Sequence, residues 1–449
     1  MRKPIIILLA AFGLVALFFL FKIDGGIERE SKSKKIEKLF RTERDSINII
    51  ELIRQDEHFV LTKTTAGWQI IKPVLTEADE NSVNLLLQTI SDAKMENPFP
   101  VRGEEMSPYG LTDEAALIVL TGSSGSGDSV KIGIETAAGE KIYAALSDSL
   151  VCLTGSALKR NAGQSLFELR DKKITQFDMN NIQSIILENQ FGNFAFVRDG
   201  SEWRMSRPMN TKADQYAVEN MLNTLTGGRI ASVVSEHKRN LNRYGLSNPA
   251  VSIELLNNAD ELESGVGFSN PRKDIIYGID EKRTLIFETD SSYVNSLNKS
   301  LYEYRCKKIL YFDIPSVDRI NLLYKGNLIT LSRDSLNDWQ LQTGEKVKIQ
   351  NVNNILKSLK NLTVKKFVAE NPTYLFPYGL TSPAGMIEIF AGDMRTAELE
   401  IGTGKNGIVY VKNPIDGDVV AVDEAVLDEI FKSKNNLIID KNLEETSEK

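Results

Sequence analysis

Histidine and cysteine are scarce in this chain of 449 residues, which contains two of each. The four residues are His58, His237, Cys152 and Cys306. A structural zinc site needs four such ligands at short spacings, and these lie far apart in sequence. The sequence therefore predicts no metal site, no cofactor and no disulfide framework, although a single Cys152–Cys306 disulfide stays open. Both histidines lie in polar, loop-like sequence, which predicts exposed side chains.

An excess of positive charge is also missing. The chain has 54 Lys and Arg against 61 Asp and Glu, a formal net charge of −7. Nucleic-acid binders usually present a strongly basic face, so no nucleic-acid partner is predicted. Hydrophobic residues make up 42% and charged residues 26%, which is typical of globular proteins and excludes a disordered or multi-span membrane protein. The length favours about three domains.

One long apolar run occupies residues 4–21, after Arg2 and Lys3 and before Lys22. As a helix it would just span a hydrocarbon core of about 30 Å. No cleavage pattern follows, so we expect an uncleaved signal anchor over residues 1–24 and a charged linker over 25–38; cleavage after Gly25–Gly26 is the alternative. Because long domains translocate largely regardless of flanking charge, we expect a single-pass protein of the bacterial cytoplasmic membrane with its body outside the cytoplasm.

The body of the chain repeats with a period of about 135 residues. Its three tryptophans are spaced by 135 and 136 residues, and a Tyr-Gly-Leu triplet follows each of them. The residues that define the repeat are Trp68, Trp203, Trp339, Tyr109, Tyr244, Tyr378, Gly110, Gly245 and Gly379. These aromatic side chains could form sugar-stacking platforms, but residues that define a folding unit more often belong to its core. We interpret them as structural.

Each copy also contains one amphipathic helix. Its apolar residues follow an i, i+3, i+4, i+7 pattern, as at Val83, Leu86, Leu87 and Ile90 in the first copy. Asp79 and Asp214 precede the first two helices, where a carboxylate can cap free N–H groups. Alternating apolar strands separated by Gly, Ser and Asn turns follow and predict antiparallel hairpins.

The predicted fold class is α+β: an N-terminal transmembrane helix followed by three tandem α+β repeat domains with antiparallel sheets. The predicted domains are residues 39–177, 178–312 and 313–440, with a polar tail over 441–449. A unit of this size can bury its own core.

The chain resembles a bacterial family catalogued as domain of unknown function 4340. The resemblance is carried by the N-terminal apolar run, by Trp-x-x-x-x-Pro-x-x-x-x-Ala-Asp before the amphipathic helix, and by Tyr-Gly-Leu-x-x-Pro. It covers about Leu39 to Asp440 and is looser in the third copy, which lacks the proline after Trp339. Family members look like envelope proteins, and some occur beside ABC-type export and gliding-motility components. The resemblance implies location and architecture but no catalytic residues.

Several motifs suggest chemistry and have simpler explanations. Residues 402–407 match GxGxxG, but a strand follows where a dinucleotide site needs a helix, so a hairpin turn is predicted. The glycine-rich stretch 122–127 lacks the lysine of a phosphate-binding loop. The carboxylates Asp178 and Asp313 recur before strands, as turn residues would. The pairs Lys172–Lys173 and Lys307–Lys308 could meet anionic lipid or glycan, but lysines that end a helix more often complement its dipole.

These observations predict no catalytic, cofactor-binding or metal-binding residues, and they leave the binding residues unknown. We expect a non-catalytic envelope protein that acts as a binding or scaffolding partner of a membrane complex; the resemblance implies subunits of an ABC-type exporter. One alternative is a hydrolase that acts on cell-surface polysaccharide through two carboxylates. Another is an extracytoplasmic ligand-binding protein with an apolar pocket in one copy only.

Overall fold

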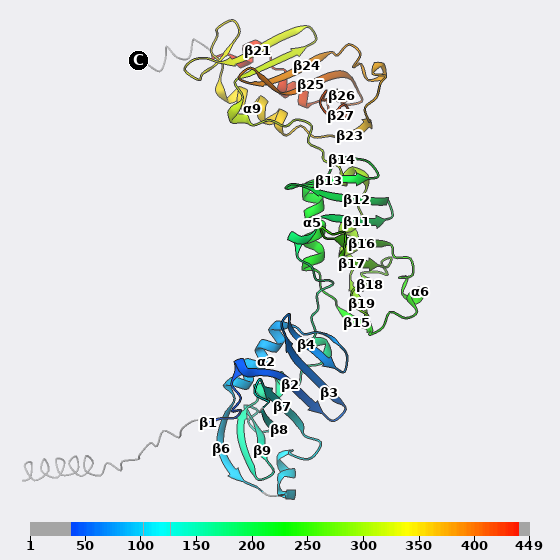
Figure 1. Ribbon diagram of the computed structural model, residues 1–449. Coiled ribbons are helices and arrows are strands. Elements are labelled where there is room, and N and C mark those ends of the chain that lie inside the picture. Colours follow the sequence, from blue (N-terminus) through cyan, green and yellow to red (C-terminus); the bar gives the residue numbers. More distant parts are fainter. Residues whose placement is uncertain (1–36, 102, 126, 440–449) are drawn as a thin grey trace, which may run out of the picture. The chain divides into compact units, whose positions relative to one another are not determined.

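The computed structural model describes residues 37–101, 103–125 and 127–439 (Figure 1). The expected anchor over 1–24 and the polar tail over 441–449 lie outside the described residues. No helix within the described residues is long and apolar enough to cross a membrane. The chain divides into two compact units, one ending at Lys172 and the other beginning at Lys173.

The first unit contains one antiparallel sheet of ten strands. In sheet order these are β1 (Glu37–Lys38), β6 (Lys94–Pro100), β10 (Leu150–Gly155), β9 (Lys141–Ser147), β8 (Gly127–Glu135), β7 (Ala116–Gly122), β2 (Ile47–Arg54), β3 (Glu57–Thr64), β4 (Gly67–Lys72) and β5 (Thr76–Glu77). Its helices are α2 (Glu80–Asp92), α3 (Ala157–Ala162) and α4 (Leu166–Leu169). Short 3-10 turns are η1 (Arg44–Ser46) and η2 (Gly103–Tyr109).

The second unit contains two sheets, built from the second and third copies. The nine-stranded sheet has the order β14 (Thr211–Lys212), β13 (Glu202–Arg207), β12 (Gly192–Asp199), β11 (Ser184–Asn189), β16 (Val251–Leu256), β17 (Leu262–Phe268), β18 (Ile275–Asp280), β19 (Ile286–Asp290) and β15 (Ser232–Ser235). The eight-stranded sheet has the order β22 (Trp339–Leu341), β21 (Asn327–Arg333), β20 (Arg319–Tyr324), β24 (Gly385–Ala391), β25 (Met394–Lys405), β26 (Ile408–Lys412), β27 (Val419–Asp423) and β23 (Lys366–Ala369).

The helices and 3-10 turns of the second unit likewise recur in its two copies. The second copy has η3 (Met179–Asn181), α5 (Gln215–Gly227), α6 (Leu241–Tyr244), α7 (Ser292–Leu297) and α8 (Leu301–Tyr304). The third has η4 (Ile314–Ser316), α9 (Ile349–Lys360), η5 (Phe376–Tyr378), α10 (Val426–Ile430) and α11 (Lys434–Leu437). Each copy therefore carries one helix longer than three turns, α2, α5 or α9, and that helix lies beside its own sheet (Figure 1).

The predicted helical stripes are confirmed, because every residue of the three stripes is buried. They are Val83, Leu86, Leu87 and Ile90 in α2, Val218, Met221, Leu222 and Leu225 in α5, and Val352, Ile355, Leu356 and Leu359 in α9. In the first and third copies these side chains join the buried strand residues in one apolar core. Burying a whole leucine or isoleucine side chain stabilises a fold by about 1.5–3 kcal/mol, so the stripe fixes the helix on its sheet.

The predicted α+β class is wrong, because the described structure is mostly antiparallel sheet with 22% helix. The strands before the long helix and those after it join edge to edge in each copy. Ile50 pairs with Leu120, Leu187 with Ile253, and Leu322 with Ile387. All six side chains are buried, so the two halves share one core face. Alternating apolar residues in both halves therefore build a single large sheet that one helix covers.

Candidate functional site

The repeat-defining tryptophans and tyrosines lie inside their own copies. Trp203 and Trp339 are each 2% exposed, and Trp68 is half-buried. Each Tyr-Gly-Leu tyrosine packs against a tyrosine from the sheet of the same copy. The ring pairs are Tyr109–Tyr143, Tyr244–Tyr277 and Tyr378–Tyr410, with centroids 4.8, 5.2 and 5.5 Å apart. These partially buried pairs hold the turn onto the sheet, and aromatic pairs of this kind contribute about 0.5–1.5 kcal/mol beyond their buried area.

The glycine of each Tyr-Gly-Leu triplet adopts a left-handed backbone conformation. The φ angles of Gly110, Gly245 and Gly379 are 68°, 70° and 67°. Non-glycine residues rarely adopt this region because Cβ then crowds the following carbonyl group. The repeated glycine is therefore explained by the turn that it makes.

Three of the four recurring aspartates act as caps, as predicted for Asp79 and Asp214. Asp79 Oδ1 accepts a hydrogen bond from the Ser82 N–H at 2.8 Å, and Asp214 Oδ1 accepts from the Ala217 N–H at 3.0 Å. Asp178 caps the 3-10 turn η3 through the Asn180 N–H at 2.9 Å. No side-chain cap bond forms at Asp313.

Replacing Asp214 is expected to destabilise the second copy more than replacing Asp79 destabilises the first. Asp214 Oδ2 also pairs with Lys307 Nζ at 3.1 Å, so Asp214→Ala removes a cap and an ion pair. We expect a loss of about 1–2 kcal/mol for Asp214→Ala and about 1 kcal/mol for Asp79→Ala. Native-state hydrogen exchange in α5 and α2 measures both. Asp214→Asn is the control, because its amide oxygen keeps the cap; a loss equal to that of Asp214→Ala would contradict the assignment.

The histidines are not brought together. His237 is exposed, as predicted. His58 is only partly exposed, with its side chain at 38%, and it lies on β3, where Nε2 contacts Glu51 Oε2 at 2.9 Å. The polar residues around it extend a hairpin instead of forming a loop. No group of three or more His, Cys, Asp or Glu side chains suited to a metal ion occurs among the described residues.

The two cysteines are free thiols with different surroundings. Cys152 is fully buried on β10, and burial raises the pKa of its thiol to about 11. Cys306 is half-buried, with Sγ 3.2 Å from the Tyr311 hydroxyl.

Native alkylation is therefore expected to modify Cys306 and spare Cys152. Thiolate is the reactive form, and with a pKa of about 11 only roughly 0.1% of Cys152 is thiolate at pH 8. Iodoacetamide at pH 8 followed by peptide mass spectrometry should show labelling at Cys306 alone, and at both sites after denaturation. Equal native labelling of the two thiols would contradict the burial of Cys152.

The GxGxxG stretch is a hairpin, as predicted. Residues up to Lys405 belong to β25, Asn406 and Gly407 form the turn with φ angles of 56° and 75°, and β26 follows. A Cβ at Gly402 would overlap the carbonyl oxygen of Tyr378. Gly402 is thus required by the close approach of the Tyr-Gly-Leu turn, and no helix follows that could receive a phosphate.

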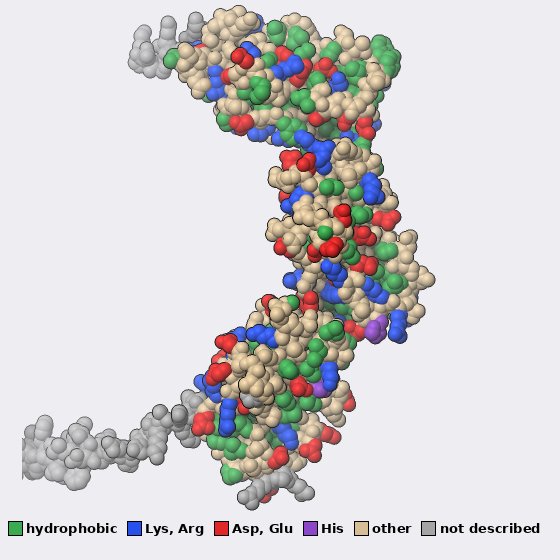
Figure 2. Space-filling model, in the orientation of Figure 1, with side chains coloured by type: hydrophobic (Ala, Val, Ile, Leu, Met, Phe, Trp, Pro, Cys, Tyr) green, Lys and Arg blue, Asp and Glu red, His purple; other side chains and the backbone are tan. Residues whose placement is uncertain are grey.

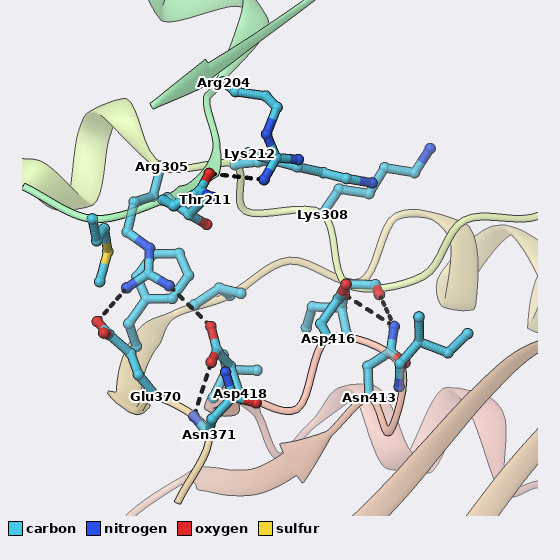
Figure 3. Close-up of a pocket in the computed structure, with 18 of the residues that line it drawn as sticks. Arg204, Thr211, Lys212, Arg305, Lys308, Glu370, Asn371, Asn413, Asp416 and Asp418 are labelled. Carbon is cyan, nitrogen blue, oxygen red and sulfur yellow. Dashed lines mark hydrogen bonds and ion pairs between the residues drawn. The ribbon is translucent and has the colours of Figure 1, made fainter. Parts of the chain in front are cut away.

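One cavity of the second unit lies where the second copy joins the third (Figure 3). The segment that connects the two copies contains Lys307 and Lys308, and its backbone pairs with the third copy. The Val364 N–H donates to the Lys307 carbonyl at 2.9 Å, and Lys308 forms an antiparallel β-bridge with Thr363. The Tyr302 hydroxyl also donates to the Val364 carbonyl at 2.9 Å. The cavity beside this segment, here called the junction pocket, has a volume of about 420 Å³ and is lined by residues of both copies.

Arg305 lines the junction pocket and joins the second copy to the third. Its side chain is 5% exposed and its guanidinium pairs with Glu370 Oε1 at 3.3 Å and Asp418 Oδ2 at 3.1 Å. It also lies 3.7 Å from the centre of the Phe367 ring. The remaining Asp418 oxygen accepts a hydrogen bond from the Asn371 N–H at 3.1 Å. One buried cation of the second copy is thus held by two carboxylates and a ring of the third.

The rest of the pocket has a cationic wall and one further carboxylate. Arg204, Lys212 and Lys308 come from the second copy (Figure 3). Asp416, from the third copy, accepts a hydrogen bond from Asn413 Nδ2 at 3.2 Å. Its enclosure by protein raises the pKa of Asp416; the charge of Lys212 opposes that shift and the charge of Asp418 adds to it.

Sequence reasoning missed most of this pocket. It noted the Lys307–Lys308 pair, but it gave no reason to join that pair with Arg204 or with the carboxylates of the third copy. The signal available was the position of Arg305, which matches Arg170 at the end of the first copy. This recurrence marks the arginine as part of the repeat, but only the structure shows that Arg305 meets the third copy.

The comparisons with known proteins concern the whole chain. A search of curated proteins found no match. Among solved structures, the crystal structure of the DNA polymerase III subunit beta from Pseudomonas aeruginosa aligns with 86% of this chain and 93% of its own, at 10% identity and a TM-score of 0.12. A similarity this low supports no conclusion about fold or function. The family described as Domain of unknown function (DUF4340) matches residues 68–202, 203–351 and 339–449, three adjacent segments that follow the repeat. The chain therefore belongs to the DUF4340 family.

Proposed function

We propose that this protein is a non-catalytic binding or scaffolding component of a bacterial envelope complex, with its repeated body outside the cytoplasm. Subunits of an ABC-type exporter are the partners that the family resemblance implies. The repeated polar residues support a structural use, since Asp79 and Asp214 cap helices and Arg305 joins two copies. What such a component needs in addition is a surface that contacts a partner.

The observation that carries the proposal is an exposed aromatic pair in the third copy. Tyr374 and Phe376 are 66% and 72% exposed, and their rings stack on each other with centroids 6.2 Å apart. They lie just before the third Tyr-Gly-Leu turn. The corresponding positions are polar in the other copies, Asn240 and Asn242 in the second and Glu105 and Ser107 in the first. Large exposed aromatic side chains with polar counterparts favour a protein contact, because aromatic residues are enriched at interfaces.

The hydrolase alternative finds less support. The pocket holds three carboxylates, and Asp416 with its raised pKa would suit a general acid. Its partner would have to be Asp418 or Glu370, and Arg305 binds both. Both oxygens of Asp418 are engaged, one by Arg305 and one by the Asn371 N–H. Glu370 is likewise bound to Arg305 through Oε1, so the arrangement of these carboxylates around one cation favours a structural use.

Co-purification tests the proposal directly. Tagged protein recovered from gently solubilised membranes should bring partner subunits with it, and the double variant Tyr374→Asn, Phe376→Asn should lose them at unchanged expression. The exposed side chains contribute little to the fold, so the variant should unfold at the same temperature as the wild type. Leu336→Asn is the matched control, because Leu336 is 78% exposed in the same copy. Recovery of a lone protein, or equal recovery of partners by the double variant, would contradict the proposal.

A further inference from the structure

Three cationic side chains on one wall of the junction pocket lack a carboxylate partner. Arg204, Lys212 and Lys308 form no ion pair with any described residue, whereas Arg305 pairs with both Glu370 and Asp418. Arg204 donates to the Asn210 side-chain oxygen at 3.0 Å. Lys212 Nζ and Lys308 Nζ lie 3.8 and 4.7 Å from the centre of the same Tyr311 ring. An amide and one neutral ring hold these side chains without cancelling their charge.

The carboxylates opposite do not cancel it either. Glu370 and Asp418 are bound to Arg305, so their charge is matched within the pocket. Asp416 faces Lys212 and accepts a hydrogen bond from Asn413, and the charge of Glu202 also acts on Tyr311. The phenol of Tyr311 stays protonated, because burial raises its pKa. Three positive charges that line one pocket repel one another, and an anion with several oxygens would relieve that repulsion.

We propose that the junction pocket binds a phosphate group through Arg204, Lys212 and Lys308. A phosphate carries up to two negative charges and at least three acceptor oxygens, so it matches three cations better than a carboxylate does. The pocket volume of about 420 Å³ admits a ligand the size of a sugar phosphate or a lipid headgroup. Met209 and Ile415 add apolar surface for the group that bears the phosphate. This site is separate from Tyr374 and Phe376, and the inference does not depend on the proposed partner.

The shared ligand chemistry has two sources, a soluble phosphomonoester and an anionic phospholipid. In the first arm, the full chain is purified in mild detergent, and its binding of inorganic phosphate and of glycerol 3-phosphate is measured by calorimetric titration at constant ionic strength. A second arm measures flotation with phosphatidylcholine vesicles that contain or lack phosphatidylglycerol. We expect binding in at least one arm. Lys212→Met and Lys308→Met should each weaken it at least about tenfold, since each removes a charge-assisted hydrogen bond.

Lys325→Met is the matched control, because Lys325 also lies over a tyrosine ring, 5.0 Å from Tyr324, but outside the pocket. It should bind as the wild type does. Binding in the titration arm assigns the site to a soluble ligand, and binding in the vesicle arm alone assigns it to a lipid headgroup; both support the site. The proposed phosphate site would be overturned by no binding in either arm. It would also be overturned if Lys212→Met and Lys308→Met bound as tightly as the wild type. The measurement needs no partner subunit, so its failure and a failure of co-purification are distinguishable.

Discussion

Arg305→Ala is expected to separate the second copy from the third and to expose the segment between them to protease. The side chain is 5% exposed, and its removal leaves Asp418, which is 25% exposed, without its cation. Breaking a buried ion pair from one side costs about 3–5 kcal/mol. Glu370 is 56% exposed, so solvent screens its ion pair with Arg305 and that pair contributes little. We therefore expect Arg305→Ala to lower the stability of the junction by about 2–3 kcal/mol, including the lost contact with Phe367.

Trypsin provides the measurement, because Lys307 and Lys308 lie in the connecting segment itself. Cleavage of a segment that opens transiently follows the population of the open form, so about 2 kcal/mol raises the rate roughly 30-fold. Arg305→Lys should fall between the wild type and Arg305→Ala, since lysine keeps the charge but cannot form the planar double contact. Arg319→Ala is the control: Arg319 lies over Phe390 in the third copy, at 4.1 Å, away from the junction. Equal cleavage of wild type and Arg305→Ala would show that the ion pairs do not hold the junction.

Local patterns in the sequence were sufficient for the repeat, the helical stripes and two helix caps. Each depends on residues a few positions apart, such as Asp79 and the Ser82 N–H that it caps. The GxGxxG hairpin was predictable for the same reason, because the strand that follows it is visible in the next residues. The position of His58 was not, since polar side chains occur both in loops and on the solvent-facing side of a strand near a hairpin turn.

The joining of the two halves of each copy into one sheet depends on pairing across long stretches of chain. Ile50 and Leu120 meet although a helix and several strands lie between them in sequence. Alternation predicts that a strand has one buried face, but it does not identify the neighbouring strand. The junction pocket is still less accessible to sequence reasoning, since Arg204 and Asp418 come from different copies. The repeat marks Arg305 as a recurring residue, with Arg170 at the matching position, but it could not supply the carboxylates that meet Arg305.

Gly379→Ala is expected to destabilise the third copy strongly. Its φ angle of 67° alone costs about 1–2 kcal/mol for a residue with a Cβ. The added methyl group would also lie 2.8 Å from the backbone nitrogen of Thr403, which belongs to β25 and cannot rotate away. Overpacking against a fixed backbone adds about 1–3 kcal/mol, so we expect a total loss of about 2–5 kcal/mol.

Two further glycines separate the cost of conformation from the cost of contact. Gly392 has a φ angle of 61° and open space around its Cβ position, so Gly392→Ala should cost about 1–2 kcal/mol in the same copy. Gly245, the counterpart of Gly379 in the second copy, has its nearest neighbour, Ser269 Cβ, at 3.5 Å, an ordinary contact. Native-state hydrogen exchange in β24–β26 and in β16–β18 measures each loss in its own copy. Equal losses for Gly379→Ala and Gly392→Ala would show that the backbone angle, not the approach of Thr403, requires the glycine of the third Tyr-Gly-Leu turn.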